Sequence, residues 1–133
     1  MKRIIGKFEI VSFPEFGISN IVAKVDTGAY SGALHCTKIK EVRGKNGKEL
    51  HFSPFDHPEL IVKAKKYEVG TVRSSNGQIE QRFLIDTTLA VAGHKYPVNI
   101  TLSDRSSMRH PMLLGSKFLE ENKFLVDVGL DNR

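Results

Sequence analysis

Short hydrophobic runs separated by polar residues repeat along most of the chain, and their partial two-residue alternation is typical of β-strands. The runs are rich in Ile, Val, Phe and Thr. They predict strands over residues 3–11, 18–25, 33–42, 65–73, 79–91 and 95–102, and a last strand over residues 123–128. Turn residues separate these runs at Pro14 to Gly17, Asn46-Gly47, Asn76-Gly77 and Gly93. Two of the turns are Asn-Gly pairs, which favour tight hairpins.

One segment has a different pattern. Residues 115–122, GSKFLEEN, predict a helix of about two turns with Phe118 and Leu119 facing inward. Residues 53–58, SPFDHP, predict an irregular connection. No repeat, linker or low-complexity tract interrupts the pattern. We therefore predict one all-β domain over residues 1–133, a barrel or a sandwich with one short C-terminal helix.

Composition narrows the functional class. The net charge of +5 favours acidic partners, but the basic residues are scattered, so we expect no nucleic-acid partner. The first residues contain one short apolar run, interrupted by Lys7 and Glu9, and predict neither a secretory signal nor a membrane span. The single cysteine, Cys36, fits a reducing compartment, and we expect a cytoplasmic protein.

The strongest candidate for chemistry is the stretch VAKVDTGAYSG, residues 22–32. Asp26 follows a strand that has apolar residues on both faces, so it lies where a buried strand leaves the core. Gly28 allows another backbone to approach closely, and Thr27 supplies a hydroxyl group. A D-T-G triplet by itself is commonly a turn or a cap, so the rest of the chain must decide its role.

A second element, PMLLGSKFL at residues 111–119, is an apolar run that ends at Gly115 and continues as the predicted helix. Together with VDTGA it resembles the acid-protease fold in its retroviral, homodimeric form. In that fold, the late apolar strand lies beside the loop that carries the aspartate. The hairpin TVRSSNGQIEQRF, residues 71–83, stands where that fold has a flap over its substrate. The resemblance implies a closed acid-protease barrel.

The chain is most similar to a bacterial retropepsin-like family labelled ATP-dependent zinc proteases, through AKVDTGAYSGALHC, VRSSNG and TLSDRSSMRHPMLLG. That family is linked to ATP-grasp ligases that add glutamates to protein or peptide ends. The resemblance implies that Asp26 is catalytic and that Thr27, Gly28 and Ala29 support its loop. It also implies a homodimer in which two Asp26 carboxylates share a proton, one activating a water and the other protonating the substrate carbonyl. No cofactor is required.

Two positions depart from the retroviral pattern. Retroviral enzymes have an acid directly after D-T-G-A and an arginine directly after the late glycine, and these two side chains pair. This chain has Tyr30 and Ser116 instead, so its dimer needs a different brace. The hairpin tip, Ser74 to Gly77, is not glycine-rich, so the resemblance does not extend to how a flap closes.

The charge and the family link suggest an acidic peptide or protein tail as the substrate. The candidate binding residues are Arg73, Ser75 and Asn76 in the hairpin, and Arg105 and Arg109 in the segment LSDRSSMRHP. Arg82 also lies on the hairpin. The planar guanidinium group of an arginine fits a carboxylate well. An alternative is that Asp104 pairs with one of the late arginines and only braces its loop.

The words "ATP-dependent" and "zinc" in the family label have no matching motif in this sequence. The sequence contains no H-E-x-x-H zinc motif and no G-x-x-x-x-G-K-[ST] phosphate loop, and its five histidines are scattered. We therefore assign no metal ligand. Two alternatives to an aspartic peptidase stay open. One is a peptide-binding module that has the same fold without the chemistry, and the other is a zinc-dependent hydrolase.

Overall fold

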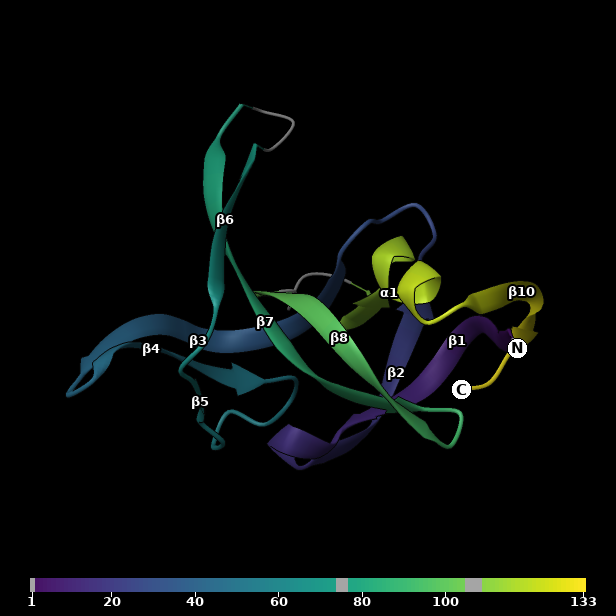
Figure 1. The fold of residues 1–133 in the computed structure, drawn as a ribbon, viewed down its shortest axis with the longest axis horizontal. Helices are drawn as coiled ribbons and strands as arrows, with labels where there is room; N and C mark the ends of the chain where they lie inside the picture. The colour runs from purple at the N-terminus through teal and green to yellow at the C-terminus, as the bar shows by residue number, and fades with distance from the viewer. Residues whose placement is uncertain (1, 74–76, 105–108) are drawn as a thin grey trace.

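Strands make up most of the described chain. The computed structural model describes residues 2–73, 77–104 and 109–133, with the backbone alone for residues 72 and 73 (Figure 1). The strands are β1 (Arg3–Phe13), β2 (Ile18–Val25), β3 (Gly32–Gly44), β4 (Gly47–Pro54), β5 (Val62–Ala64), β6 (Glu68–Arg73), β7 (Ile79–Val91), β8 (His94–Ser103), β9 (Met112–Leu114) and β10 (Phe124–Asp131). A 3-10 turn, η1 (Pro14–Phe16), and a helix, α1 (Ser116–Glu121), complete the described elements.

Six of these strands close into a barrel. Their order is β1-β2-β9-β3-β8-β7, and β7 returns to β1 through the pairs Val11–Val91 and Ser12–Ala90. Closure gives each of the six strands a neighbour on both sides, which removes the free edges that open sheets leave. The expected all-β barrel with one short C-terminal helix is thereby confirmed.

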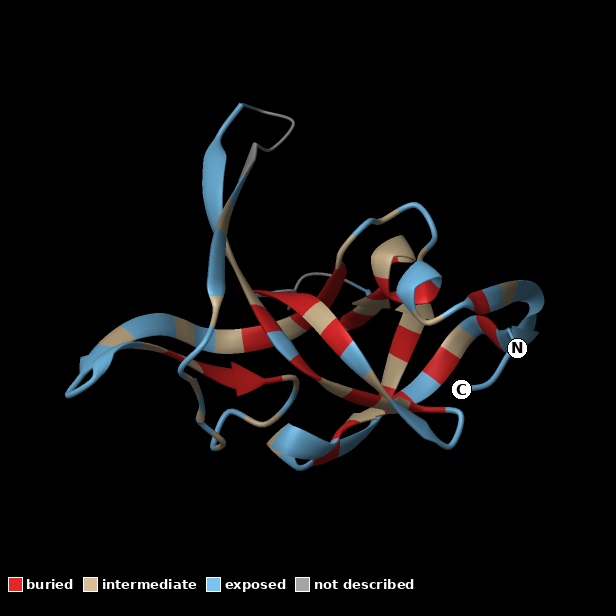
Figure 2. Cartoon of the chain, in the orientation of Figure 1, coloured by how far each residue is buried: buried red, intermediate tan, exposed pale blue. Residues whose placement is uncertain are grey.

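The core is formed by side chains from all six barrel strands and from β4. Side chains that alternate along the strands are buried, as the banded pattern in Figure 2 shows. The largest fully buried side chains are Phe13, Phe52, Ile5, Ile21, Leu34, Leu50, Leu89, Ile100, Leu102, Met112 and Leu114. Since burial of an aliphatic or aromatic side chain contributes about 1.5–3 kcal/mol, this cluster is the main source of stability.

Two hairpins extend away from the barrel, and both are largely exposed (Figure 2). One is formed by β3 and β4, and the other by β6 and β7. The β3–β4 turn was predicted at Asn46-Gly47, but its two turn residues are Lys45 and Asn46. Gly47 is the first residue of β4 and has φ +112°, a conformation that glycine adopts without strain. At the β7–β8 turn, Ala92 and Gly93 both have positive φ, as a type I′ turn requires.

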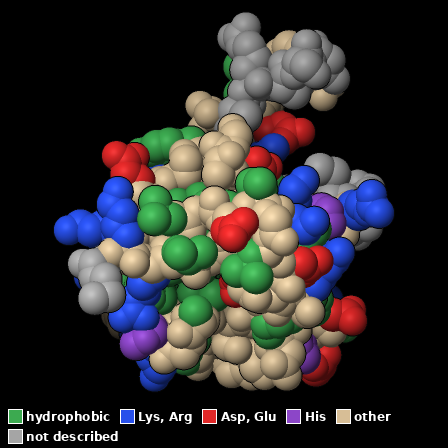
Figure 3. Space-filling view, turned by 90° about the vertical axis from the view of Figure 1, so that its right-hand side faces the viewer, with side chains coloured by type: hydrophobic (Ala, Val, Ile, Leu, Met, Phe, Trp, Pro, Cys, Tyr) green, Lys and Arg blue, Asp and Glu red, His purple; other side chains and the backbone are tan. Residues whose placement is uncertain are grey.

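The ends of the chain lie side by side. β1 pairs with β10 in parallel, from Arg3 opposite Phe124 onward. The buried carboxylate of Glu9 holds this junction, since its Oε2 accepts hydrogen bonds from the Gly6 N–H (2.7 Å) and the Asn132 amide (2.6 Å). The face that carries the chain ends shows hydrophobic and charged side chains interspersed (Figure 3).

In the part of the chain that the structure describes, no helix is long and apolar enough to cross a membrane.

We predict that Glu9→Ala lowers the free energy of unfolding by about 2 kcal/mol. The reason is that two donors lose a charged, buried acceptor. Urea unfolding followed by circular dichroism measures this loss. The control is Glu120→Ala on the exposed end of α1, which should change stability by less than about 0.5 kcal/mol. Equal stability of the two variants would show that the Glu9 contacts do not secure the chain ends.

Candidate active site

Asp26 stands directly after β2, at the point where β9 ends beside it. β9 lies between β2 and β3. It pairs in parallel with β2, where Val25 is opposite Leu114, and antiparallel with β3. The Asp26 N–H donates to the Leu114 carbonyl at 2.9 Å, which extends the β2–β9 ladder by one residue. The late apolar run therefore lies next to the aspartate, as the resemblance implied.

The Asp26 loop, residues 26–31, is organised by the aspartate itself. The Gly28 N–H donates to Asp26 Oδ1 at 3.0 Å, and the Ala29 N–H donates to the Asp26 carbonyl at 3.2 Å. The first bond closes a turn in which a side-chain oxygen takes the place of a backbone acceptor, and the second is an ordinary backbone turn bond. The Asp26 side chain is partly buried, whereas Thr27 and Gly28 are exposed. The carboxylate is therefore held in one orientation and remains reachable.

The start of α1 braces the same loop from the other side. The Ser116 N–H donates to the Ala29 carbonyl at 2.7 Å, and the Lys117 N–H donates to the Tyr30 carbonyl at 3.0 Å. The first N–H groups of a helix have no partner within the helix, so the loop carbonyls satisfy them. Figure 1 shows the loop after β2 rising beside α1. The loop is therefore tied to both β9 and α1.

Gly115 allows this contact to be so close. A Cβ atom at this position would lie 2.5 Å from the Tyr30 carbonyl oxygen and 2.7 Å from the Ser31 carbonyl carbon. Its φ of −93° is available to any residue, so the requirement for glycine is one of space alone. The late glycine is needed because the backbone of the Asp26 loop passes over it.

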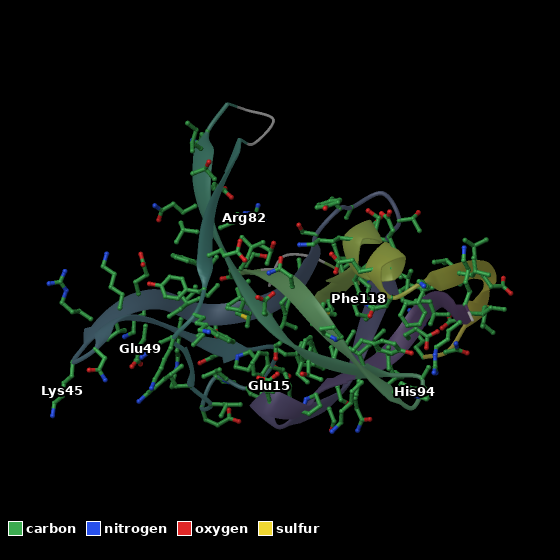
Figure 4. The ribbon with its side chains drawn as sticks, viewed as in Figure 1. Glu15, Lys45, Glu49, Arg82, His94 and Phe118 are labelled. Carbon is green, nitrogen blue, oxygen red and sulfur yellow. The ribbon has the colours of Figure 1, made fainter. Side chains whose placement is uncertain are left out.

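A cleft of about 430 Å³ lies between the β6–β7 hairpin and the barrel. Its lining residues are Ser31, Gly32, Ala33, Gly70, Thr71, Arg82, Leu84, Thr101 and Leu113. They come from the start of β3, from both strands of the hairpin, and from β8 and β9. Ser31 is the last residue of the Asp26 loop, so the cleft begins where that loop ends. Figure 4 labels Arg82 on the stem of the hairpin.

The structure places some predicted site residues in one loop, and others lie outside the described residues. Asp26, Thr27, Gly28 and Ala29 form one loop, whereas Arg109 is exposed and does not line the cleft. Ser75, Asn76, Arg105 and the side chain of Arg73 lie outside the described residues. Arg82, which the sequence places on the hairpin but which is not among the candidate binding residues, does line the cleft. Its position depends on the strand register, which the sequence pattern did not give.

Cys36 and the histidines lie in surroundings of their own. Burial raises the pKa of the Cys36 thiol to about 12, so Cys36 is not a nucleophile at neutral pH. Over residues 2–73, 77–104 and 109–133, no three His, Cys, Asp or Glu side chains group as a metal site would require. His51 and His57 instead lie beside the neighbouring carboxylates of Glu49 and Glu59, at 3.2 and 3.4 Å.

The amino-acid sequence is similar to those of known proteins. The family model "RimB-like: Retropepsin-like aspartic endopeptidase RimB" matches residues 4–132. Two relatives named "Probable alpha-L-glutamate ligase" come from Shewanella halifaxensis (strain HAW-EB4) and Desulfotalea psychrophila (strain LSv54 / DSM 12343). The first is 34% identical over 131 residues, which are 95% of this chain and 28% of the relative. The second is 31% identical over 136 residues, which are 97% of this chain and 29% of that relative. The chain thus spans less than a third of the length of these curated relatives.

A solved structure shows the same fold. It belongs to a protein of unknown function from Legionella pneumophila subsp. pneumophila str. Philadelphia 1, and its sequence is 23% identical. The superposition covers 99% of this chain and 98% of that chain, with a TM-score of 0.77. At this level of identity the likeness concerns the fold alone.

We predict that Gly115→Ala destabilises the protein by at least about 2 kcal/mol, because its methyl group would displace the backbone of the Asp26 loop. Thermal unfolding followed by circular dichroism measures the change. The matched control is Gly44→Ala in β3, whose methyl group would have its nearest neighbours at 3.5 Å, an ordinary contact. If the two variants unfold at the same temperature, the close crossing at Gly115 is not a constraint on the fold.

Proposed function

Because the chain belongs to the RimB-like family of retropepsin-like aspartic endopeptidases, we propose that it hydrolyses peptide bonds with two Asp26 carboxylates, one from each of two chains. The observation that carries this proposal is the Asp26 loop. Its carboxylate is oriented by the Gly28 N–H, and its backbone is fixed by β9 and α1. A reacting group needs such fixed geometry, since small displacements cost large factors in rate.

The chemistry follows from placing two carboxylates close together. At short separation both cannot ionise easily, so the pair holds one shared proton. The ionised Asp26 takes a proton from a water molecule as that water attacks the scissile carbonyl carbon. The protonated Asp26 gives its proton to the carbonyl oxygen, which yields a tetrahedral diol. When the diol collapses, the ionised Asp26 takes a proton from one diol hydroxyl as the C=O bond re-forms. The C–N bond breaks, and the other Asp26 gives its proton to the leaving amine, so that the pair again holds one proton. No covalent bond to the enzyme forms.

A homodimer is required by this proposal, since each chain supplies one Asp26. Tyr30 lies in the same loop and supports it: 67% of this residue's surface is exposed, so it is available for a contact with a second chain. Tyr30 also occupies the position at which retroviral enzymes have their bracing acid. We propose that contacts of Tyr30 across the two-fold axis replace the missing acid–arginine pair.

The proposed substrate is an acidic peptide or protein tail, with the protein acting in the cytoplasm. Two observations support an acidic substrate. The chain has a net charge of +5, and the relatives that it matches are named "Probable alpha-L-glutamate ligase". A positive field raises the local concentration of an anionic substrate.

We predict that Asp26→Asn lowers the cleavage rate of a glutamate-tailed peptide by about 10³-fold or more, because an amide cannot act as the base. The fold should be kept, since an asparagine oxygen can still accept the Gly28 N–H. Mass spectrometry of the products measures the rate. The matched control is Asp127→Asn, because Asp127 Oδ1 accepts the Gly129 N–H at 2.9 Å in a turn of the same kind.

Full activity of Asp26→Asn would refute the proposal. Activity that is lost in EDTA and restored by zinc would favour the zinc-dependent hydrolase. Peptide binding by the unchanged protein without any cleavage would favour the binding module.

We predict a dimer in sedimentation equilibrium at micromolar concentrations, with a specific activity that falls on dilution. Tyr30→Glu should shift the equilibrium toward monomer and lower the specific activity, because it places two like charges near the axis. The activity should recover as protein concentration is raised. A monomer with full activity at every concentration would contradict the proposed pairing of two Asp26 side chains.

A further inference from the structure

The cleft between the β6–β7 hairpin and the barrel carries a charge that the proposed reaction does not use. Of the nine described residues that line it, Arg82 alone bears a charge, and the others are glycine, alanine, serine, threonine or leucine. Among the described lining residues, this guanidinium group is therefore the one that attracts an anion by its charge.

The strand register leaves space around Arg82. It lies directly opposite Gly70 in the β6–β7 ladder, and both residues line the cleft. Gly70 has no side chain to cover the guanidinium group from the neighbouring strand. Its φ is not positive, and a Cβ atom there would meet Leu84 at 3.5 Å, an ordinary contact. Glycine is therefore not required by the backbone, and its effect here is to keep the cleft open.

Arg82 already holds a carboxylate, but weakly. Its Nη2 lies 3.3 Å from Glu80 Oε2, and these side chains point the same way because they are two residues apart on one strand. The two side chains are 34% and 55% exposed, and ion pairs in such surroundings contribute little. A guanidinium group presents five N–H donors, and Glu80 contacts one nitrogen. A substrate carboxylate can therefore replace Glu80 at small cost.

The other face of β7 anchors the strand. Phe83 packs edge-on against Tyr67 with ring centroids 6.1 Å apart, and the Tyr67 hydroxyl donates to Glu41 Oε2 at 2.6 Å. This hydrogen bond raises the pKa of Tyr67 and ties the base of the hairpin to β3. Arg82 therefore projects into the cleft from a strand that is held on its opposite side.

We propose that Arg82 binds the side-chain carboxylate of an acidic residue in the substrate, and that Glu80 is an internal carboxylate which this residue displaces. Arginine suits the role because its planar group accepts a carboxylate through two parallel hydrogen bonds. Glu80 increases the preference for acidic substrates. A neutral substrate side chain that displaces Glu80 leaves Arg82 without an ion pair, whereas a substrate glutamate forms a new one. This inference rests on the proposed function and assigns its substrate preference to one residue.

The test compares two peptides of equal length that differ by one glutamate-to-glutamine change, using the complete protein. Arg82→Gln should lower kcat/KM for the glutamate peptide about tenfold, mainly by raising KM. The kcat/KM for the glutamine peptide should change less than twofold. Arg82→Lys should retain part of the preference, because it keeps the charge and loses the planar group. Glu80→Gln should lower the KM for the glutamate peptide severalfold.

One control separates a local contact from a general effect of charge, and one further variant tests the cleft itself. Arg43→Gln, on the exposed β3–β4 hairpin, removes the same charge and should leave the ratio between the two peptides unchanged. Gly70→Val should raise KM for both peptides, because it fills the cleft. An unchanged KM in Gly70→Val would overturn the proposal, as would an equal loss for both peptides in Arg82→Gln.

A binding measurement keeps this test independent of the reaction. In an Asp26→Asn background, titration calorimetry should show tighter binding of the glutamate peptide, and Arg82→Gln should remove that difference. If Asp26 is not needed for cleavage, the proposed function is refuted. The difference in affinity between the two peptides still tests the role of Arg82. If Asp26 is essential and the two peptides bind equally well, the role of Arg82 is refuted and the proposed function stands.

Discussion

The crossing of Gly115 under the Asp26 loop is the contact on which the arrangement of the site depends. The missing side chain lets the backbone of Tyr30 and Ser31 pass within a distance that any Cβ atom would block. That proximity brings the first N–H groups of α1 to the loop carbonyls, and the Leu114 carbonyl to the Asp26 N–H. One absent methyl group thus allows a loop, a strand end and a helix start to brace each other.

This brace explains why a short loop can present a carboxylate in one orientation. The barrel supplies rigid neighbours on both sides, because β9 is inserted between β2 and β3 and all three strands carry core residues. The loop itself adds the bond from the Gly28 N–H to the Asp26 carboxylate. The β6–β7 hairpin is different: beyond the barrel it is mostly exposed, and Phe83, Tyr67 and Glu41 fasten its base. A fixed aspartate and a cleft under a projecting hairpin are the parts that a peptide-binding site needs.

Much of this could be predicted from the sequence, and the exceptions have physical reasons. Strong alternation predicts strands, and the predicted strand over residues 79–91 matches β7 at both ends. The strands β4 and β5 are not predicted, since few of their residues form an apolar run. Pairing of β4 with β3, and of β5 with β4, decides their conformation. The parallel pairing of β1 with β10 joins the two ends of the chain, and no local pattern encodes it. The place of Arg82 in the cleft depends on its register opposite Gly70, which only the folded hairpin fixes.

The central claim is that two Asp26 side chains act as one unit, and a crystal structure of the protein in its solution oligomer measures this directly. The account predicts a two-fold axis between the Asp26 loops, with the two carboxylates within hydrogen-bonding reach, about 2.5–3.2 Å between oxygen atoms. Carboxylates separated by more than about twice that distance could not share a proton, and that result would contradict the account.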